Sequence, residues 1–157
     1  MIGVGDEVLF TINLEDCDDI CWSVVKGPGR FTDQGVFTSD TPGFVTVSVF
    51  CGSSFSAKLS FAVHSNNAAQ LPKALTRIDE QAFMNSIIEE FRLPDGITSI
   101  GSRAFSGCST LLVCVPDSVD DIADDAFADS ATICIVCEKD SYAERYAKMH
   151  GVKYVTE

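Results

Sequence analysis

Apolar and polar side chains alternate over several short runs within residues 1–64, namely at 8–14, 20–24, 45–49 and 59–63. Alternation with a period of two predicts half-buried β-strands. Turn residues separate the runs, namely Gly27-Pro28-Gly29, Asp33-Gln34-Gly35 and Thr41-Pro42-Gly43. This pattern predicts a small β-sandwich over residues 1–64.

After a polar stretch of small residues at 65–70, which we interpret as a linker, the pattern becomes an internal repeat. Leu71-Pro72, Leu93-Pro94 and Val115-Pro116 are each 22 residues apart. A fixed period in the twenties predicts a solenoid, in which stacked coils align equivalent apolar residues into a continuous core. The expected core positions are Ile78, Phe83, Ile100, Phe105, Ile122 and Phe127.

The end of the chain breaks the repeat and predicts one helix at about 141–150. Ser141 and Glu144 form a capping box, and Gly151 is a typical C-terminal stop. Tyr142, Tyr146 and Met149 are expected to share its apolar face. This helix, with a last strand at 152–155, would cover the final coil.

The chain of 157 residues has a net charge of −12, with 23 acidic and 11 basic residues. Nucleic acid and anionic membranes are therefore expected to be repelled. No apolar run is long enough for membrane insertion, and the first residues lack the pattern of a signal peptide. If the protein acts outside a cell, we expect its export signal to be absent from this sequence.

Residues 71–157 resemble the BspA-like leucine-rich repeats of bacterial surface proteins. The best match is the unit at 93–111, and the segment from Ser141 to Tyr154 resembles the terminal cap of that family. The resemblance implies a buried thiol at Cys108. It also implies an extracellular or cell-surface location in bacteria.

Residues 1–64 resemble a bacterial immunoglobulin-like domain. The similar features are Val4-Gly5-Asp6, the single Trp22, and the segments at 35–38 and 43–49. The usual strand before Val4 is missing, so we expect a fragment of a longer protein. The complete expectation is a mainly β chain: an immunoglobulin-like sandwich, then a short leucine-rich repeat solenoid capped by a C-terminal helix.

Seven cysteines cannot all pair within one chain. The Cys134-Ile135-Val136-Cys137 motif suggests a zinc or redox site, but residues three apart on a strand point to opposite faces, and no histidine lies nearby. Small apolar ladder residues are the favoured interpretation. Cys17, Cys21 and Cys51 lack the antibody-type arrangement, and a disulfide of another kind among them stays open.

The run from Asp117 to Asp129 carries six carboxylates and suggests calcium, yet its apolar members are the repeat core positions. A solvated acidic face is therefore favoured. Catalysis finds little support, because His64 and His150 lie in different modules and outside any nucleophile motif. We expect no enzyme activity, no cofactor and no metal.

The sequence thus predicts a binding module that recognises a protein or glycan on a host or matrix surface through strands at 88–93, 110–115 and 132–137. Two alternatives stay open: a structural spacer near the end of a longer surface protein, and an accessory module of a larger secreted enzyme. The expected binding residues are the outward ones of the first two strands: Glu90, Arg92, Leu112 and Cys114.

Overall fold

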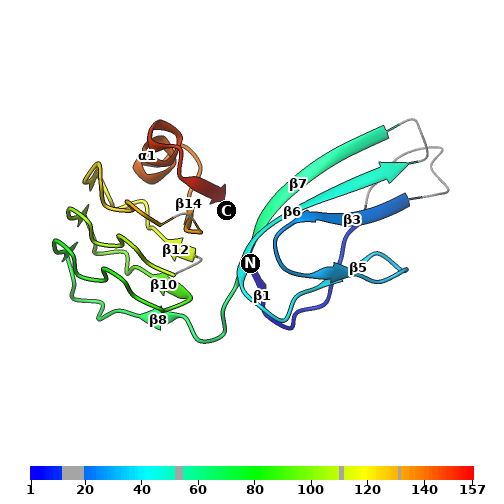
Figure 1. Cartoon of the computed structure of the whole chain (residues 1–157), viewed down its shortest axis with the longest axis horizontal. Helices are drawn as coiled ribbons and strands as arrows, with labels where there is room; N and C mark the ends of the chain where they lie inside the picture. The colour runs from blue at the N-terminus through cyan, green and yellow to red at the C-terminus, as the bar shows by residue number, and fades with distance from the viewer. Residues whose placement is uncertain (12–19, 52–54, 110–111, 131) are drawn as a thin grey trace. The chain divides into compact units, whose positions relative to one another are not determined.

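The computed structural model describes residues 1–11, 20–51, 55–109, 112–130 and 132–157. These residues form strands throughout and a single helix near the C-terminus (Figure 1). The chain divides into two compact units, Met1–Asn66 and Asn67–Glu157. The mainly β class expected from the sequence is confirmed.

The first unit contains two sheets. One has four strands in the order β1-β7-β6-β3, and the other has three strands in the order β2-β5-β4. The strands of the first sheet are β1 (Ile2–Gly3), β7 (Phe55–His64), β6 (Gly43–Cys51) and β3 (Ile20–Lys26). Those of the second sheet are β2 (Val8–Leu9), β5 (Val36–Thr38) and β4 (Arg30–Phe31).

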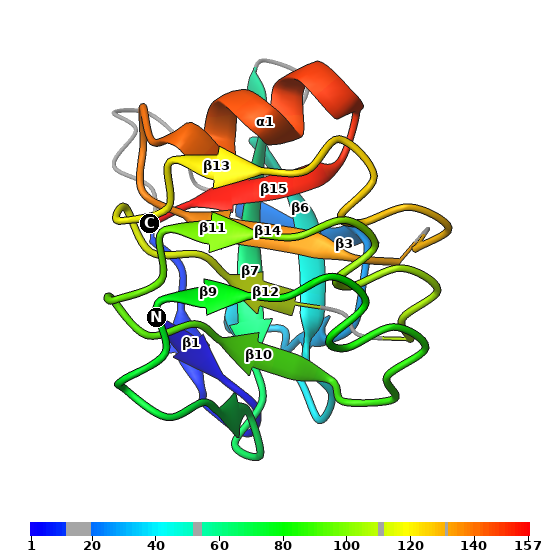
Figure 2. The same cartoon turned by 90° about the vertical axis from the view of Figure 1, so that its left-hand side faces the viewer.

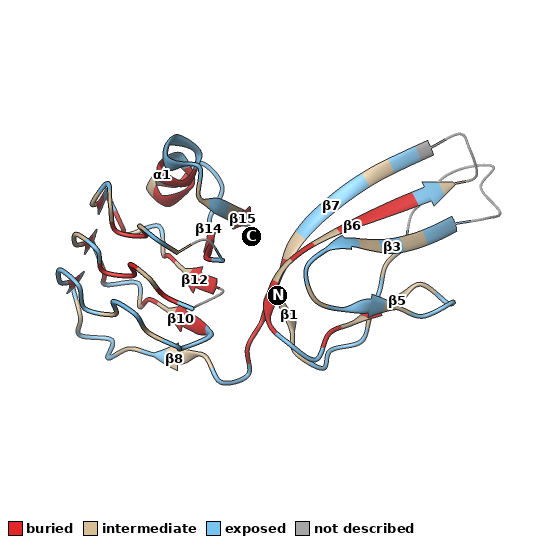
Figure 3. Cartoon of the chain, in the orientation of Figure 1, coloured by how far each residue is buried: buried red, intermediate tan, exposed pale blue. Residues whose placement is uncertain are grey.

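The core of the first unit is formed by inward residues of both sheets. Phe37 of β5, Val45 and Val47 of β6, and Val63 of β7 are all completely buried. Burial alternates over the first residues of β6, from Gly43 to Val47, in step with its apolar-polar pattern. Most of this strand is buried, and its exposed residue lies near the C-terminal end (Figure 3). The predicted strands at 20–24, 45–49 and 59–63 are thereby confirmed.

One expectation for the first unit needs correction, and another is tested only in part. A short strand, β1, precedes Val4, where none is expected from the sequence; it pairs in parallel with β7, and the N–H of Val4 donates to the carbonyl of His64. The strand expected at 8–14 is described only at β2, and its members Ile12 and Leu14 lie outside the described residues.

The second unit stacks the repeats through two parallel sheets. Partners in these sheets occupy equivalent positions of successive repeats, as in Glu90↔Leu112 and Ser99↔Asp121. One sheet has the order β15-β14-β12-β10-β8 and the other β13-β11-β9 (Figure 2). The first five are β15 (Lys153–Thr156), β14 (Cys134–Cys137), β12 (Leu112–Cys114), β10 (Glu90–Arg92) and β8 (Ala69–Gln70). The other three are β13 (Asp121–Ile122), β11 (Ser99–Ile100) and β9 (Arg77–Ile78).

Each repeat begins with the same turn. The carbonyls of Pro72, Pro94 and Pro116 each accept a hydrogen bond from the N–H three residues later. Proline sets the turn because its φ is fixed and it has no N–H to donate to a ladder. One part of the expected linker is ordered in this stack, since Ala69–Gln70 forms β8 and pairs with β10.

Aromatic rings stack through the core of the second unit. Phe105 lies 5.3 Å from Phe83 and 5.3 Å from Phe127, and the planes of Phe105 and Phe127 differ by only 5°. All six predicted core positions belong to this cluster or pack against it. The equivalent positions of the repeats therefore pack into one apolar cluster.

The helix α1 (Tyr142–His150) covers the end of the stack (Figure 2). The Ser141 hydroxyl accepts from the N–H of Glu144 at 3.2 Å, and Gly151 ends the helix in a left-handed conformation. Tyr146 packs on Phe127 with 5.9 Å between ring centroids. The expectation that Met149 shares this apolar face is wrong: it is 79% exposed, because Ala143, Tyr146 and Ala147 form the buried stripe.

Candidate binding face of the repeat sheet

The candidate binding face lies on β10 and β12, on the side of their sheet away from the repeat core. Phe91 and Val113, the central residues of these strands, belong to the core. Side chains alternate along a strand, so their neighbours lie on the opposite face. These neighbours are the four residues predicted from the sequence: Glu90, Arg92, Leu112 and Cys114.

The parallel register places the four residues next to one another. Glu90 is the partner of Leu112, and Arg92 is the partner of Cys114. The constant length of the repeat forces this arrangement, because equivalent positions of successive coils must occupy the same ladder rung. The structure therefore brings the predicted residues together; their role in binding stays a prediction.

An ion pair dominates the polar part of this face. The Nε of Arg92 lies 2.7 Å from Oε1 of Glu90, two residues away on the same strand face. The hydrogen bond to Glu90 raises the pKa of Arg92 above its ordinary value, and the charge of Glu90 acts in the same direction. The guanidinium is thus permanently charged and held in a fixed orientation.

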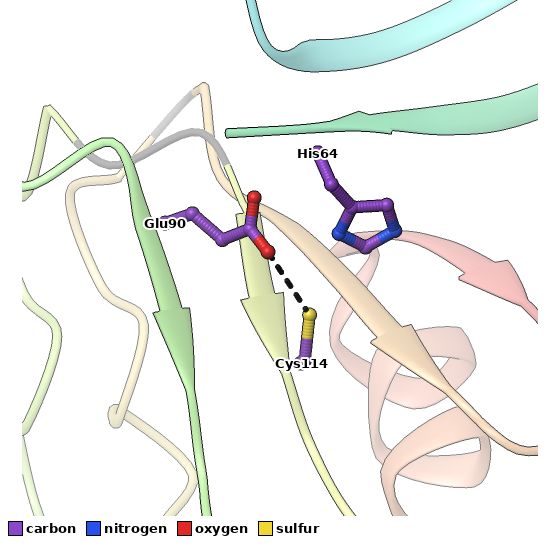
Figure 4. Close-up of side chains that lie close together, drawn as sticks. All are labelled: His64, Glu90 and Cys114. Atoms are coloured by element: carbon purple, nitrogen blue, oxygen red, sulfur yellow. Dashed lines mark hydrogen bonds between the residues drawn. The ribbon is translucent and has the colours of Figure 1, made fainter. Parts of the chain in front are cut away.

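The thiol of Cys114 also faces this ion pair. Its Sγ lies 3.7 Å from Oε1 of Glu90, the oxygen that Arg92 also contacts (Figure 4). One carboxylate oxygen therefore holds two side chains from neighbouring strands. This arrangement presents a cation beside a polarisable sulfur, which suits recognition of a polar group.

The exposure of this face differs from the expectation. Glu90 and Leu112 are completely buried, whereas the side chain of Arg92 is 36% exposed and Cys114 is partly exposed. Burial of the Glu90 carboxylate is compatible with its charge because Arg92 neutralises it. Of the four predicted residues, Arg92 and Cys114 are the accessible ones.

The Cys134–Cys137 motif forms strand β14, and both thiols are buried. Burial raises the pKa of Cys134 to about 12 and also raises that of Cys137. Only Cys137 belongs to the repeat core, in keeping with the expected opposite faces. Cys108 is buried as well, and its thiol donates to the carbonyl of Phe83 at 3.0 Å.

The first unit contains both a disulfide-bonded cysteine and a free one. Cys51 is disulfide-bonded, whereas Cys21 is free and exposed. Cys17, the third candidate, lies outside the described residues. A disulfide at Cys51, which the sequence left open, is therefore present.

We predict five free thiols per chain when the denatured, unreduced protein is labelled with a maleimide and analysed by mass spectrometry, because a disulfide occupies two of the seven cysteines. In the native protein at pH 8, Cys21 should be labelled first. Cys134 should resist, because a thiol with a pKa of about 12 is almost entirely protonated. Prior reduction should raise the denatured count to seven; seven labels without reduction would contradict the disulfide.

The acidic run at 117–129 forms the outside of the third repeat. Its apolar positions are buried, and its carboxylates are exposed or half-exposed. Asp125 accepts from the hydroxyl of Ser102 at 3.0 Å, and Asp124 lies 3.6 Å from the imidazole of His150. These carboxylates thus form an acidic outer face of the third repeat.

The two histidines lie at the ends of elements in different units. His150 stacks on Tyr146 at the end of α1, and His64 is the last residue of β7.

The structure also contains a cavity that has no counterpart among the sequence predictions. It has a volume of about 460 Å³ and lies beside the third repeat and the segment after α1. Its lining includes Phe127, Asp129, Ser130, Ile133, Val152 and Lys153. The sequence feature that could have predicted this cavity is the end of the repeat pattern after Phe127, because no further repeat covers the last coil of the stack.

Comparison with known proteins identifies the repeats. A family model described as a BspA type leucine rich repeat region, in six copies, matches residues 57–145, more than half of the chain. The chain belongs to the BspA type leucine rich repeat family. The match to this family begins within β7 and ends within α1, so its limits differ from the predicted block at 71–157. No curated protein matches the chain.

Membership places the chain in a general functional class. BspA type leucine rich repeat proteins are typically bacterial surface proteins, and their repeats are generally non-catalytic modules for protein interaction. Within the described residues, no helix has the length and apolar character that a membrane span requires.

Proposed function

We propose that this BspA type chain is a non-catalytic recognition module of a bacterial surface or secreted protein. In this proposal the first unit is an immunoglobulin-like sandwich that spaces and presents the second. The second unit is a short leucine-rich repeat solenoid, capped by α1, that binds a protein or glycan of a host or matrix surface. Two sheets around one apolar core support the sandwich assignment.

The observation that carries the proposal is the row of equivalent side chains on β10 and β12. Parallel pairing of successive repeats holds Glu90, Arg92, Leu112 and Cys114 on one face, independent of the core. Surfaces of this kind suit recognition because a rigid ladder fixes the positions of the contact groups. Arg92 is the expected main contact, since arginine with its planar donor fork is enriched among residues that dominate interfaces.

Binding of the purified chain to an immobilised basement-membrane matrix preparation tests the proposal. We expect saturable binding that Arg92→Gln weakens about tenfold. Glutamine keeps a donor for Glu90 but removes the charge and the fork. Enzymatic removal of the glycans from the matrix distinguishes a glycan partner from a protein partner.

Arg77→Gln is the matched control. Arg77 also lies two residues from an acidic partner on a short strand, with 2.7 Å between its Nε and Oδ1 of Asp79, but it belongs to β9 in the other sheet. We expect its binding to equal that of the unchanged chain. Equal binding of all three proteins would contradict a contact through Arg92 of β10. Absence of saturable binding would favour the spacer alternative.

A further inference from the structure

The backbone of each repeat donates hydrogen bonds to the next repeat at one corner. The N–H groups of Phe83 and Asn85 donate to the carbonyls of Ala104 and Ser106, at 2.8 and 2.9 Å. The same pattern recurs one coil later. There the N–H groups of Phe105 and Gly107 donate to the carbonyls of Ala126 and Ala128, at 2.8 and 3.0 Å. The two N–H donors of each corner are therefore satisfied by two carbonyls of the next repeat, which are two residues apart.

The third repeat has the same corner but no fourth coil. Asp129 has a φ of 58°, close to 60° at Asn85 and 63° at Gly107, so the backbone turns in the same way. The chain continues into α1 instead of another repeat. Within the described part of the chain, the N–H groups of Phe127 and Asp129 consequently have no hydrogen-bond partner.

The cavity of about 460 Å³ lies at this corner. Phe127 and Asp129 line it on the repeat side, and Val152 and Lys153 line it on the side of the segment after α1. Ile133, which is buried, adds a further apolar wall. A concave site with apolar walls, lined by residues whose backbone N–H groups are available as donors, has the usual composition of a ligand site.

We propose that this cavity binds an extended peptide segment of a partner protein. Two carbonyls of the peptide, two residues apart, accept hydrogen bonds from the N–H groups of Phe127 and Asp129. The peptide thus replaces the missing fourth coil, as a strand added to a sheet edge replaces a missing neighbour. This site shares no residue with the β10–β12 face and does not depend on the function proposed for that face.

The structure also restricts the residue between the two carbonyls. In the repeats, that position is Phe105 or Phe127, whose ring enters the core stack. Beyond Phe127 the next place in the stack is already taken by Tyr146, whose ring centroid lies 5.9 Å away. The bound peptide must therefore carry a small side chain, such as alanine, at this position.

A titration of the isotope-labelled full chain by NMR tests the site. The probe is a capped peptide, Gly-Ser-Arg-Ala-Ala-Ser-Gly, which copies residues 101–107 with alanine in place of the phenylalanine. We expect saturable shifts of the Phe127 and Asp129 amide signals and slower hydrogen exchange of both. The amides of Phe105 and Gly107, which already donate to the third coil, should stay unchanged.

Two comparisons complete the experiment. The peptide that retains phenylalanine should bind about tenfold more weakly, because Tyr146 blocks its ring. Val152→Trp, which fills the cavity, should abolish the shifts, whereas Met149→Trp on the exposed side of α1 should not. The titration of the unchanged chain decides the matter even if Val152→Trp does not fold. Absence of saturable shifts at Phe127 and Asp129, or shifts there with a chitotriose probe but not with the peptide, would overturn the proposal.

Discussion

Replacing Phe105 by alanine is expected to destabilise the second unit by about 3–5 kcal/mol. The Phe105 ring is completely buried and lies between the rings of Phe83 and Phe127, with Phe91 against its edge at 5.3 Å. Alanine removes these contacts and leaves a cavity that two neighbouring coils, fixed by their ladders, cannot close.

The effect can be measured by urea unfolding followed by circular dichroism at 222 nm. This signal reports on the second unit, because α1 is the only helix among the described residues. Met149→Ala, at a position 79% exposed on the same helix, should change the free energy of unfolding by less than about 0.5 kcal/mol. A Phe105→Ala protein that unfolds at the same urea concentration as the control would contradict a continuous ring core.

Replacing Gly27 by alanine is expected to destabilise the first unit by about 3 kcal/mol. Gly27 has a φ of 95°, which side chains with a Cβ rarely adopt. An added Cβ would also overlap the carbonyl oxygen of Phe44 and lie 2.9 Å from Cα of Val45. Both are backbone atoms of a central strand, so neither can move without disturbing β6.

The fluorescence of Trp22 reports this loss, because it is the single tryptophan and packs on Phe10 and Phe31 in the first unit. Gly5→Ala is the matched control. Gly5 has a similar φ of 82°, but no heavy atom lies within 4 Å of an added Cβ. Gly5→Ala should lower the free energy of unfolding by only about 1–2 kcal/mol, which is the effect of the backbone conformation alone. Equal losses for both substitutions would mean that the close approach to Phe44 has no consequence.

The repeat core was predictable because its signal is redundant. The same apolar positions recur three times, and a stack with a constant period must align them, so the sequence alone places Ile100 and Phe105 in the core. The helix was also predictable, since Ser141, Glu144 and Gly151 act on backbone groups within one or two turns. Helix ends that depend on neighbouring residues, and a core that depends on an exact repeat, can both be predicted from one sequence.

Other features depend on contacts between distant segments and were missed. Strand β1 exists because Ile2 meets Val63, and β8 exists because Ala69 meets Phe91. Neither two-residue strand has a pattern of its own. Helical spacing alone places Met149 on the buried face, but the surface beneath α1 is contacted by Ala143, Tyr146 and Ala147.

For the candidate sites, the repeat period alone establishes which residues share a face. A constant period on a parallel ladder pairs Glu90 with Leu112, and Arg92 with Cys114, of the following repeat. The folded chain was needed to show that Glu90 is buried and paired with Arg92, and that Phe127 and Asp129 line a cavity at the last corner of the stack. Periodicity dictates equivalence between repeats, whereas burial and unused hydrogen bonds depend on where the repeats stop and what packs on the last one.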